Sequence, residues 1–192
     1  MHLSKRRGLQ AKLSRVRCLN EAVPGSCRNV FKSWEKRLEP TQVPLRSNED
    51  DPELLLHIPF DGAVKLKAIS VIGSGDPSKS PSKMKVWVNR EDVDFAAAER
   101  MPPVQEWELQ PENVGGVLEY PTQVAKFSGV HTLDMLFTGN FGADITEIHF
   151  VGLKGEFSER KRAAVEAVYE SRGIPADHKV PEKEAGSWGG AQ

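Results

Sequence analysis

The fold class is decided by the stretch Glu53-Leu54-Leu55-Leu56-His57-Ile58-Pro59-Phe60-Asp61-Gly62-Ala63-Val64-Lys65-Leu66-Lys67-Ala68. In its first half, alternate residues from Leu54 to Phe60 are apolar and fall on one face of a β-strand. In its second half, apolar residues from Val64 onward alternate with lysines. The Asp61-Gly62 dipeptide between the two halves favours a two-residue hairpin turn. The stretch therefore predicts a β-hairpin.

Strand patterns continue on the C-terminal side of this hairpin. Ile69, Val71 and Ile72 place apolar side chains on both faces, which is typical of a strand in the middle of a packed sheet. Further short strand-like runs are separated by turn residues and cover residues 83–89, 107–109, 117–120, 124–127, 131–137 and 145–153. The one helical run among them, residues 95–100, ends at two prolines. This all-β pattern predicts an antiparallel β-sandwich or barrel, and the missing crossover helices exclude a parallel α/β fold.

The two ends of the chain differ from the strand-rich region in composition. Residues 1–17 contain six basic residues and no acidic residue, so they carry a charge of +6 and the remainder carries −7. Leu9, Leu13 and Val16 follow helical spacing, so the segment predicts a solvated basic tail, a helix that docks on a partner, or a transit peptide. The composition of residues 181–192 predicts a flexible C-terminal tail.

The segments next to the strands are less regular. We expect residues 18–52 to wrap over the domain, with one or two helical turns around residues 30–38. Residues 160–172 fit either a helix or a final strand. The expected organisation is a basic extension over residues 1–17, one domain over residues 18–180, and the tail.

Size and charge limit the class of protein. The chain has 192 residues, of which 39% are hydrophobic, and a chain of this length can build one core without metals or disulfides. The net charge is −1, and no basic stripe carries interleaved aromatic residues, so we expect no nucleic-acid partner for the domain. No apolar run reaches the ~18 residues of a membrane span, and no secretory signal is present. We expect a soluble intracellular protein.

The residues that commonly carry chemistry do not form a catalytic or metal-binding pattern. Cys18 and Cys27 lack a second cysteine pair, so we expect two reduced thiols rather than a zinc site or a disulfide. His57, His131 and His149 lack the spacing of metal ligands and are expected at the surface or between strands. We therefore expect no catalytic, cofactor-binding or metal site.

Loop motifs lead to the same expectation. Residues 73–75 and 139–144 are rich in glycine, but neither run has the helix and Lys-Ser/Thr sequence of a phosphate-binding loop, so both predict turns. The acidic runs at residues 49–51 and 91–94 are typical of solvated loops. His178 is expected to hydrogen-bond locally with Asp177.

Several motifs occur in an order that resembles the PITH domain family. They are Cys18-Leu19-Asn20-Glu21, the acidic run leading to residues 53–60, Val64-Lys65-Leu66-Lys67, Lys126-Phe127-Ser128-Gly129-Val130, Asn140-Phe141-Gly142-Ala143-Asp144, Gly152-Leu153-Lys154-Gly155-Glu156 and Pro175-Ala176-Asp177-His178. The resemblance extends from about Cys18 to Val180. It is closest to the stand-alone members of the family, because the sequence shows neither a thioredoxin nor a Cys-x-x-Cys motif.

This resemblance implies a jelly-roll β-sandwich similar to galactose-binding-like domains and to the Doc subunit of the anaphase-promoting complex. It favours a strand over a helix near residues 165–169, and it implies no catalytic residue and no cofactor. The family members that carry a thioredoxin associate with the proteasome regulatory particle. Members are generally cytoplasmic and nuclear, so we expect this location, with import into an organelle through residues 1–17 as the alternative.

Three hypotheses about function follow, and the oligomeric state stays open. The first is a non-catalytic interaction module that docks on a large protein complex, with the proteasome regulatory particle as the named candidate. Its candidate partner-binding aromatic residues are Phe31, Trp34, Trp87 and Trp107. The second is a jelly roll that binds a small ligand or glycan, which predicts aromatic residues and carboxylates in the loops at residues 74–81 and 89–99. An enzyme that uses a cysteine ranks last.

Overall fold

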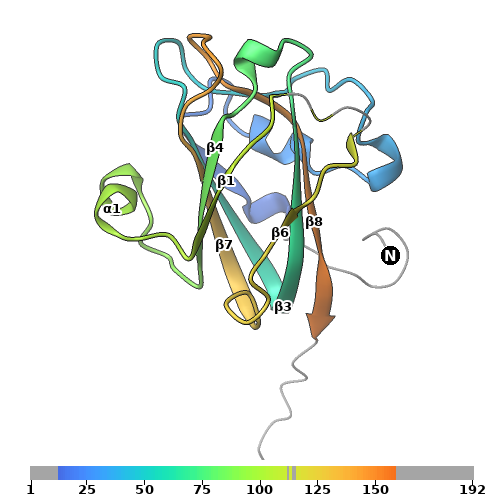
Figure 1. Ribbon diagram of the computed structural model, residues 1–192, viewed down its shortest axis with the longest axis vertical. Helices are drawn as coiled ribbons and strands as arrows, with labels where there is room; N and C mark the ends of the chain where they lie inside the picture. Colours follow the sequence, from blue (N-terminus) through green and yellow to red (C-terminus); the bar gives the residue numbers. More distant parts are fainter. Residues whose placement is uncertain (1–12, 112, 114–115, 159–192) are drawn as a thin grey trace, which may run out of the picture. The chain divides into compact units, whose positions relative to one another are not determined.

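The computed structural model describes residues 13–111, 113 and 116–158. The expected C-terminal tail, the ambiguous segment 160–172 and residues 1–12 of the basic extension lie outside these residues. Within the described residues, strands dominate and helices are short (Figure 1). The elements are η1 (Leu13–Arg15), β1 (Arg17–Leu19), η2 (Ser26–Val30), η3 (Trp34–Lys36), β2 (Leu45–Arg46), β3 (Leu54–Gly73), η4 (Pro77–Lys79), β4 (Lys83–Val88), α1 (Phe95–Arg100), β5 (Gln105–Glu108), β6 (Tyr120–Pro121), β7 (Val130–Phe137) and β8 (Glu147–Ser158), where η denotes a 3-10 helix.

The sheet is organised around β3, which pairs with four other strands. The strand order is β2-β8-β3-β7-β4-β5, with β1 and β6 also paired to β3, and the pairings are antiparallel. Residues 54–59 of β3 pair with β7, whereas residues 63–73 pair with β8. We call the strands beside the first segment, β1, β7, β4 and β5, the β7 half, and those beside the second, β8, β2 and β6, the β8 half.

Both halves bury side chains in one core. Leu54, Leu56 and Ile58 enter it from the first segment of β3, and Leu66 and Ile69 enter it from the second. The alternation in the sequence identifies the buried face correctly from Leu54 as far as Leu66. Beyond Leu66 the register of β3 shifts, and Ile69 rather than Ala68 enters the core. The predicted antiparallel β-sandwich is confirmed.

The predicted hairpin at Asp61-Gly62 is wrong. The backbone remains a strand through both residues, and the register of β3 shifts between Pro59 and Val64. A two-residue hairpin turn of the type expected for Asp-Gly needs positive φ at both positions, and neither residue has it. The chain instead bends and passes from one half of the sheet to the other (Figure 1). A period of two shows which face of a strand is buried but not which strand is its partner.

Two shorter strand predictions also differ from the structure. Residues 124–127 form a turn in which the amides of Lys126 and Phe127 donate to the carbonyl of Gln123. The strand expected at residues 117–120 is limited to β6. Phe127 is nevertheless fully buried, because an apolar residue at a turn can fill a core as well as one on a strand. The helix at residues 95–100 is confirmed as α1, and the Asp94 side chain caps it by accepting from the Ala97 amide.

The segment before β3 wraps over the sandwich, as predicted. After β1, the segment is held at Glu21, whose carboxylate accepts from the amides of Gly25 and Cys27 at the start of η2. Cys27 is then buried in the core, as is Val16 on the N-terminal side, which is 1% exposed. The last residues of the basic extension therefore pack into the domain.

Candidate functional site

The aromatic residues proposed as partner anchors occupy different depths. Trp87 is 3% exposed and lies with Leu55, Leu136 and Ala98 of α1 on the outer face of the β7 half. Trp107 and Phe31 are half-buried against the core, and the Trp107 indole N–H donates to the carbonyl of Pro121. The structure thus gives Trp87 and Trp107 packing or hydrogen-bonding partners within the domain.

Trp34 lies on the other half of the sheet. Its ring meets Phe150 of β8 edge-on, with ring centroids 6.1 Å apart, and the Arg37 guanidinium lies 4.3 Å from its centroid. Arg37 also donates to the carbonyl of Gly116. These contacts join η3 to the loop before β6.

Two large apolar side chains are exposed at this junction. Leu38 is 57% exposed and Val117 is 67% exposed. They lie close together, because Leu38 is adjacent to Gly116, the residue before Val117. We call Trp34, Leu38 and Val117 the η3 patch. Single exposed apolar residues are common on protein surfaces, whereas a cluster of them marks a candidate contact surface.

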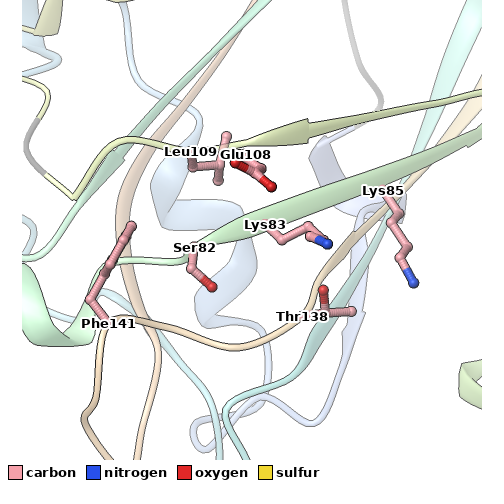
Figure 2. A pocket seen from close by; sticks show the side chains of 7 residues that line it. All are labelled: Ser82, Lys83, Lys85, Glu108, Leu109, Thr138 and Phe141. Carbon is pink, nitrogen blue, oxygen red and sulfur yellow. The ribbon is translucent and has the colours of Figure 1, made fainter.

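A polar hollow of about 410 Å³ opens on the β7 half, beyond the part that α1 covers. We call it the β4–β5 hollow. It is lined by Ser82, Lys83, Lys85, Glu108, Leu109, Thr138 and Phe141 (Figure 2). Phe141 is 42% exposed, which is unusual for such a large apolar side chain on an ordered loop.

The polar side chains in this hollow form no hydrogen bonds or ion pairs with other described residues. Among the described residues, the hydroxyls of Ser82 and Thr138 and the ammonium groups of Lys83 and Lys85 have no hydrogen-bond or ion-pair partner. The same is true of the Glu108 carboxylate, although Glu108 is the register partner of Lys83. Figure 2 shows the ends of both lysines on the same side of β4 as the two hydroxyls. Convergent polar groups beside an exposed aromatic ring are typical of a binding site.

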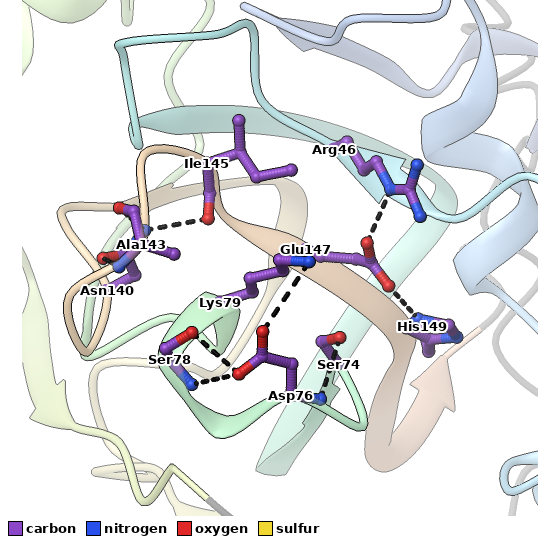
Figure 3. A network of polar contacts seen from close by, with 10 residues as sticks. All are labelled: Arg46, Ser74, Asp76, Ser78, Lys79, Asn140, Ala143, Ile145, Glu147 and His149. Carbon is purple, nitrogen blue, oxygen red and sulfur yellow. Dashed lines mark hydrogen bonds and ion pairs between the residues drawn. The ribbon is translucent and has the colours of Figure 1, made fainter.

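Backbone contacts hold Phe141 in place. The loop between β7 and β8 is joined to the loop around η4, because the amides of Phe141 and Ala143 both donate to the carbonyl of Ser78. Gly139 and Gly142 flank the ring with positive φ, as the glycine-rich sequence of this turn predicts. The Asn140 side chain donates to the carbonyls of Ala143 and Ile145 (Figure 3).

A second network fixes the start of β8. The Glu147 carboxylate accepts from Arg46 and contacts Nε2 of His149 (Figure 3). Burial opposes ionisation of this carboxyl, but the hydrogen bonds from His149 and Arg46 outweigh burial and lower its pKa. In the same figure, Asp76 caps the amide of Ser78 and pairs with Lys79. Both networks hold loops in place, and neither lines the β4–β5 hollow.

His57 and His149 each contact a carboxylate, and the two cysteines are inert thiols of the fold. Nδ1 of His57 lies 2.6 Å from the buried carboxylate of Asp134, its register partner on β7, so His57 is an interstrand residue as predicted. Burial, followed by the nearby Glu21 carboxylate, raises the pKa of the Cys27 thiol to about 12. Burial also raises the pKa of Cys18 far above its usual range. Both cysteines are free thiols, and neither ionises near neutral pH.

The described residues contain neither a metal-binding cluster nor a helix that could span a membrane. No group of three or more His, Cys, Asp or Glu side chains in this part of the chain is placed to hold a metal ion. No helix within it combines the length and apolar character that crossing a membrane requires.

Sequence patterns alone did not identify the β4–β5 hollow. The glycan hypothesis predicts aromatic residues in the loops at 74–81 and 89–99. Phe95, however, begins α1 and packs against the cluster around Trp87, and the exposed ring is Phe141, on a later loop. The only sequence feature that could have indicated this hollow is the pair of glycines around Phe141. They predict a turn, and an aromatic residue in a turn does not belong to the buried face of a strand. The lysines were indistinguishable from other surface lysines.

Comparisons with known proteins support the family resemblance. A family profile described as the PITH domain matches residues 10–173. The chain is 40% identical over 164 residues to PITH domain-containing protein 1 of Dictyostelium discoideum, an alignment that covers 85% of this chain and 79% of that protein. It is 41% identical over 173 residues to PITH domain-containing protein 1 of Homo sapiens, covering 90% and 80% of the two chains.

One solved structure illustrates the likeness in fold. The C-terminal domain of a chitobiase from Bacteroides fragilis aligns with a TM-score of 0.50 at 12% identity, covering 78% of this chain and 99% of that domain. At such low identity the likeness concerns the fold alone. The fold is the jelly-roll type of antiparallel β-sandwich.

Proposed function

The chain belongs to the PITH domain family, and from this membership we propose that it is a non-catalytic interaction module that docks on a large multi-subunit protein assembly. The observation that carries the proposal is the η3 patch, where Leu38 and Val117 are exposed side by side. Exposed apolar side chains gain free energy when a partner removes them from water. Trp34 adds an aromatic ring at the edge of this patch, and Trp and Tyr are frequent among the residues that dominate binding energy.

The proteasome regulatory particle is the leading candidate for that assembly. The resemblance to family members that carry a thioredoxin implies this partner, and the cytoplasm and nucleus are the corresponding location. A protein imported into an organelle would lose its basic N-terminus, so N-terminal sequencing of the mature protein distinguishes the two locations.

A non-catalytic role is also supported by the state of the nucleophilic side chains. A thiol whose pKa is about 12, as for Cys27, supplies almost no thiolate at neutral pH. The rings of His57 and His149 each contact a carboxylate. Among the described residues, no serine, threonine or cysteine side chain hydrogen-bonds to either ring.

A second candidate function, binding of a small ligand or glycan, is favoured by the β4–β5 hollow. Its unpaired hydroxyls could hydrogen-bond to the hydroxyls of a sugar, and the exposed ring of Phe141 could stack on the sugar ring. This candidate is an outcome of the experiment in the next subsection.

Affinity capture of the tagged protein at moderate salt, followed by quantitative mass spectrometry, tests the main proposal. We expect regulatory-particle subunits to be enriched with the full chain and with a chain lacking residues 1–12. Deleting residues 1–17 would also remove Val16, which is part of the core. Enrichment is expected to fall about tenfold in the Leu38→Glu/Val117→Glu variant, because a buried charge without a partner disrupts an apolar contact.

The control is Val23→Glu, which adds one negative charge, half of the change in the patch variant, at an exposed valine outside the patch. It should be captured as well as the wild type. Enrichment of a different assembly, or no enrichment, would reject the proteasome assignment. Full capture of the patch variant would reject the η3 patch as the contact surface.

A further inference from the structure

The β4–β5 hollow combines two cations with two hydroxyl donors and an apolar wall. We propose that it binds an acidic side chain of a protein partner, with the apolar residue that follows it packed on Phe141. This inference rests on the proposed function, because it names the chemistry of the partner of an interaction module. It concerns a different surface from the η3 patch.

The two lysines of the hollow lie on the same outer face of β4. Lys83 and Lys85 are successive outward residues of β4, so their Cα atoms lie about 7 Å apart along the strand. The two ammonium groups and the hydroxyl of Thr138 can therefore converge on the two oxygens of one carboxylate. Hydrogen bonds between ionised groups are the stronger kind.

The positive charges of Lys83 and Lys85 are not neutralised by ion pairs. Their register partners on β5 are Glu108 and Glu106, yet neither lysine forms an ion pair with a described carboxylate. Lys85 also lies near the carboxyl group of Glu53. Burial and nearby carboxylates raise the pKa of Glu53, and the positive charge of Lys85 offsets only part of this increase. Lys83 is the cation with fewer acidic neighbours, so it should contribute more to binding an acid.

Glu108 selects the kind of acidic ligand. Its carboxylate has no donor within the described residues, and a peptide can supply one from its backbone N–H. A free phosphate ion also carries an O–H donor at neutral pH, but that donor shares one phosphorus with the negative oxygens, so Glu108 repels the ion's charge wherever it donates. A peptide instead carries its N–H and its carboxylate on separate groups. The hollow therefore fits a carboxylate on a peptide better than an inorganic anion.

The apolar wall completes the site. Phe141 is exposed but held by two backbone hydrogen bonds from its loop to Ser78, and Leu109 lines the hollow beside β5. A rigid aromatic ring loses little conformational entropy when it is covered. An apolar residue next to the acid would cover this ring.

Nuclear magnetic resonance titration of the full-length, ¹⁵N-labelled chain tests the proposal. The probe is the peptide acetyl-Gly-Asp-Glu-Leu-Phe-Gly-amide, compared with acetyl-Gly-Asn-Gln-Leu-Phe-Gly-amide, which has the same shape without the charges. We expect the acidic peptide to shift the amides of residues 82–85, 108–109 and 138–141. The amide peptide should bind at least several-fold more weakly.

Three variants locate the charges. Lys83→Ala/Lys85→Ala should weaken binding of the acidic peptide roughly fivefold, as expected for two exposed ion pairs. Lys65→Ala removes an exposed strand lysine on the β8 half and should leave binding unchanged. Glu108→Gln should strengthen binding of the acidic side chain, a gain that loss of folding cannot produce.

Each alternative has a distinct result. Equal binding of the two peptides, or an equal effect of Lys65→Ala, would overturn the proposal. Inorganic phosphate that binds with the same lysine dependence would show a general anion site, and chitobiose that shifts the same amides more strongly would show a glycan site; either result also overturns it. The titration needs no assembly, so it can fail while regulatory-particle capture succeeds, or succeed while capture fails.

Discussion

The outer faces of the two sheet halves are covered by segments from outside the sheet, but to different depths. On the β7 half, α1 covers Trp87 so fully that its indole N–H is buried and has no partner among the described residues. On the β8 half, η3 brings Trp34 over Phe150 but leaves Trp34 only partly buried. The burial of a tryptophan on the outer face of this sheet therefore depends on how completely the connecting segment covers it.

The largest expected effect is a difference in stability between these two tryptophans. Trp87→Ala should lower the free energy of unfolding by about 3–5 kcal/mol, because it leaves a cavity between α1 and the sheet. Trp34→Ala should cost less, about 1–2 kcal/mol, since part of its apolar surface already meets water and is not buried by η3. Urea unfolding at pH 7 measures both. Equal costs would mean that α1 does not seal the β7 half.

Trp87→Phe is the control for that comparison. It keeps most of the ring volume and removes the buried N–H that lacks a partner. Removing an unsatisfied polar group offsets the loss of ring volume, so this variant should be far less destabilised than Trp87→Ala. A large loss would indicate that the N–H has a partner in solution.

The same contrast explains how much the sequence could predict. The alternation from Leu54 to Ile58 identified the buried face of β3, because one-sided burial leaves a period of two. It could not show that Asp61-Gly62 carries the chain to the opposite half of the sheet, since strand pairing depends on residues far away in sequence. The order of motifs identified the family, but family membership does not reveal a binding surface.

The candidate site was harder to predict for a related reason. Its lining comes from β4, β5 and the loop after β7, which meet only in the folded chain. Lys83 faces Glu108 in register, and sequence reasoning would pair them. The two side chains do not pair because their rotamers direct them apart, and rotamers leave no pattern in the sequence.

Buried carboxylates provide the second, intermediate test of the two halves. On the β8 half, Glu147 has both Arg46 and His149 as partners, whereas on the β7 half one oxygen of Asp134 has none among the described residues. Glu147→Gln should cost about 1.5–3 kcal/mol at pH 7, the range for hydrogen bonds to a charged group. Urea unfolding of both proteins measures this loss.

The pH dependence of that loss has a definite sign. The folded-state pKa of Glu147 lies below the ordinary value of 4.5. Its contribution to stability is therefore complete above about pH 4.5 and is lost as the pH falls through the lower folded-state pKa. The stability difference between wild type and Glu147→Gln should shrink below that pH. A difference that stays constant down to pH 3 would contradict the assigned hydrogen bonds.

The smallest effect on stability is expected at the exposed ring of the β7 half. Phe141→Ala should lower the free energy of unfolding by only about 1 kcal/mol or less, since 42% of the residue is already in water and its loop is held by backbone hydrogen bonds. The same variant should weaken binding of the acidic peptide several-fold, because it removes the apolar wall of the hollow. Trp87→Ala would reverse this pattern, with a large loss of stability. If Phe141→Ala instead destabilised the chain by 2 kcal/mol or more, roughly the cost of a buried aromatic contact, the ring would belong to the fold, and the β7 half would present no binding surface there.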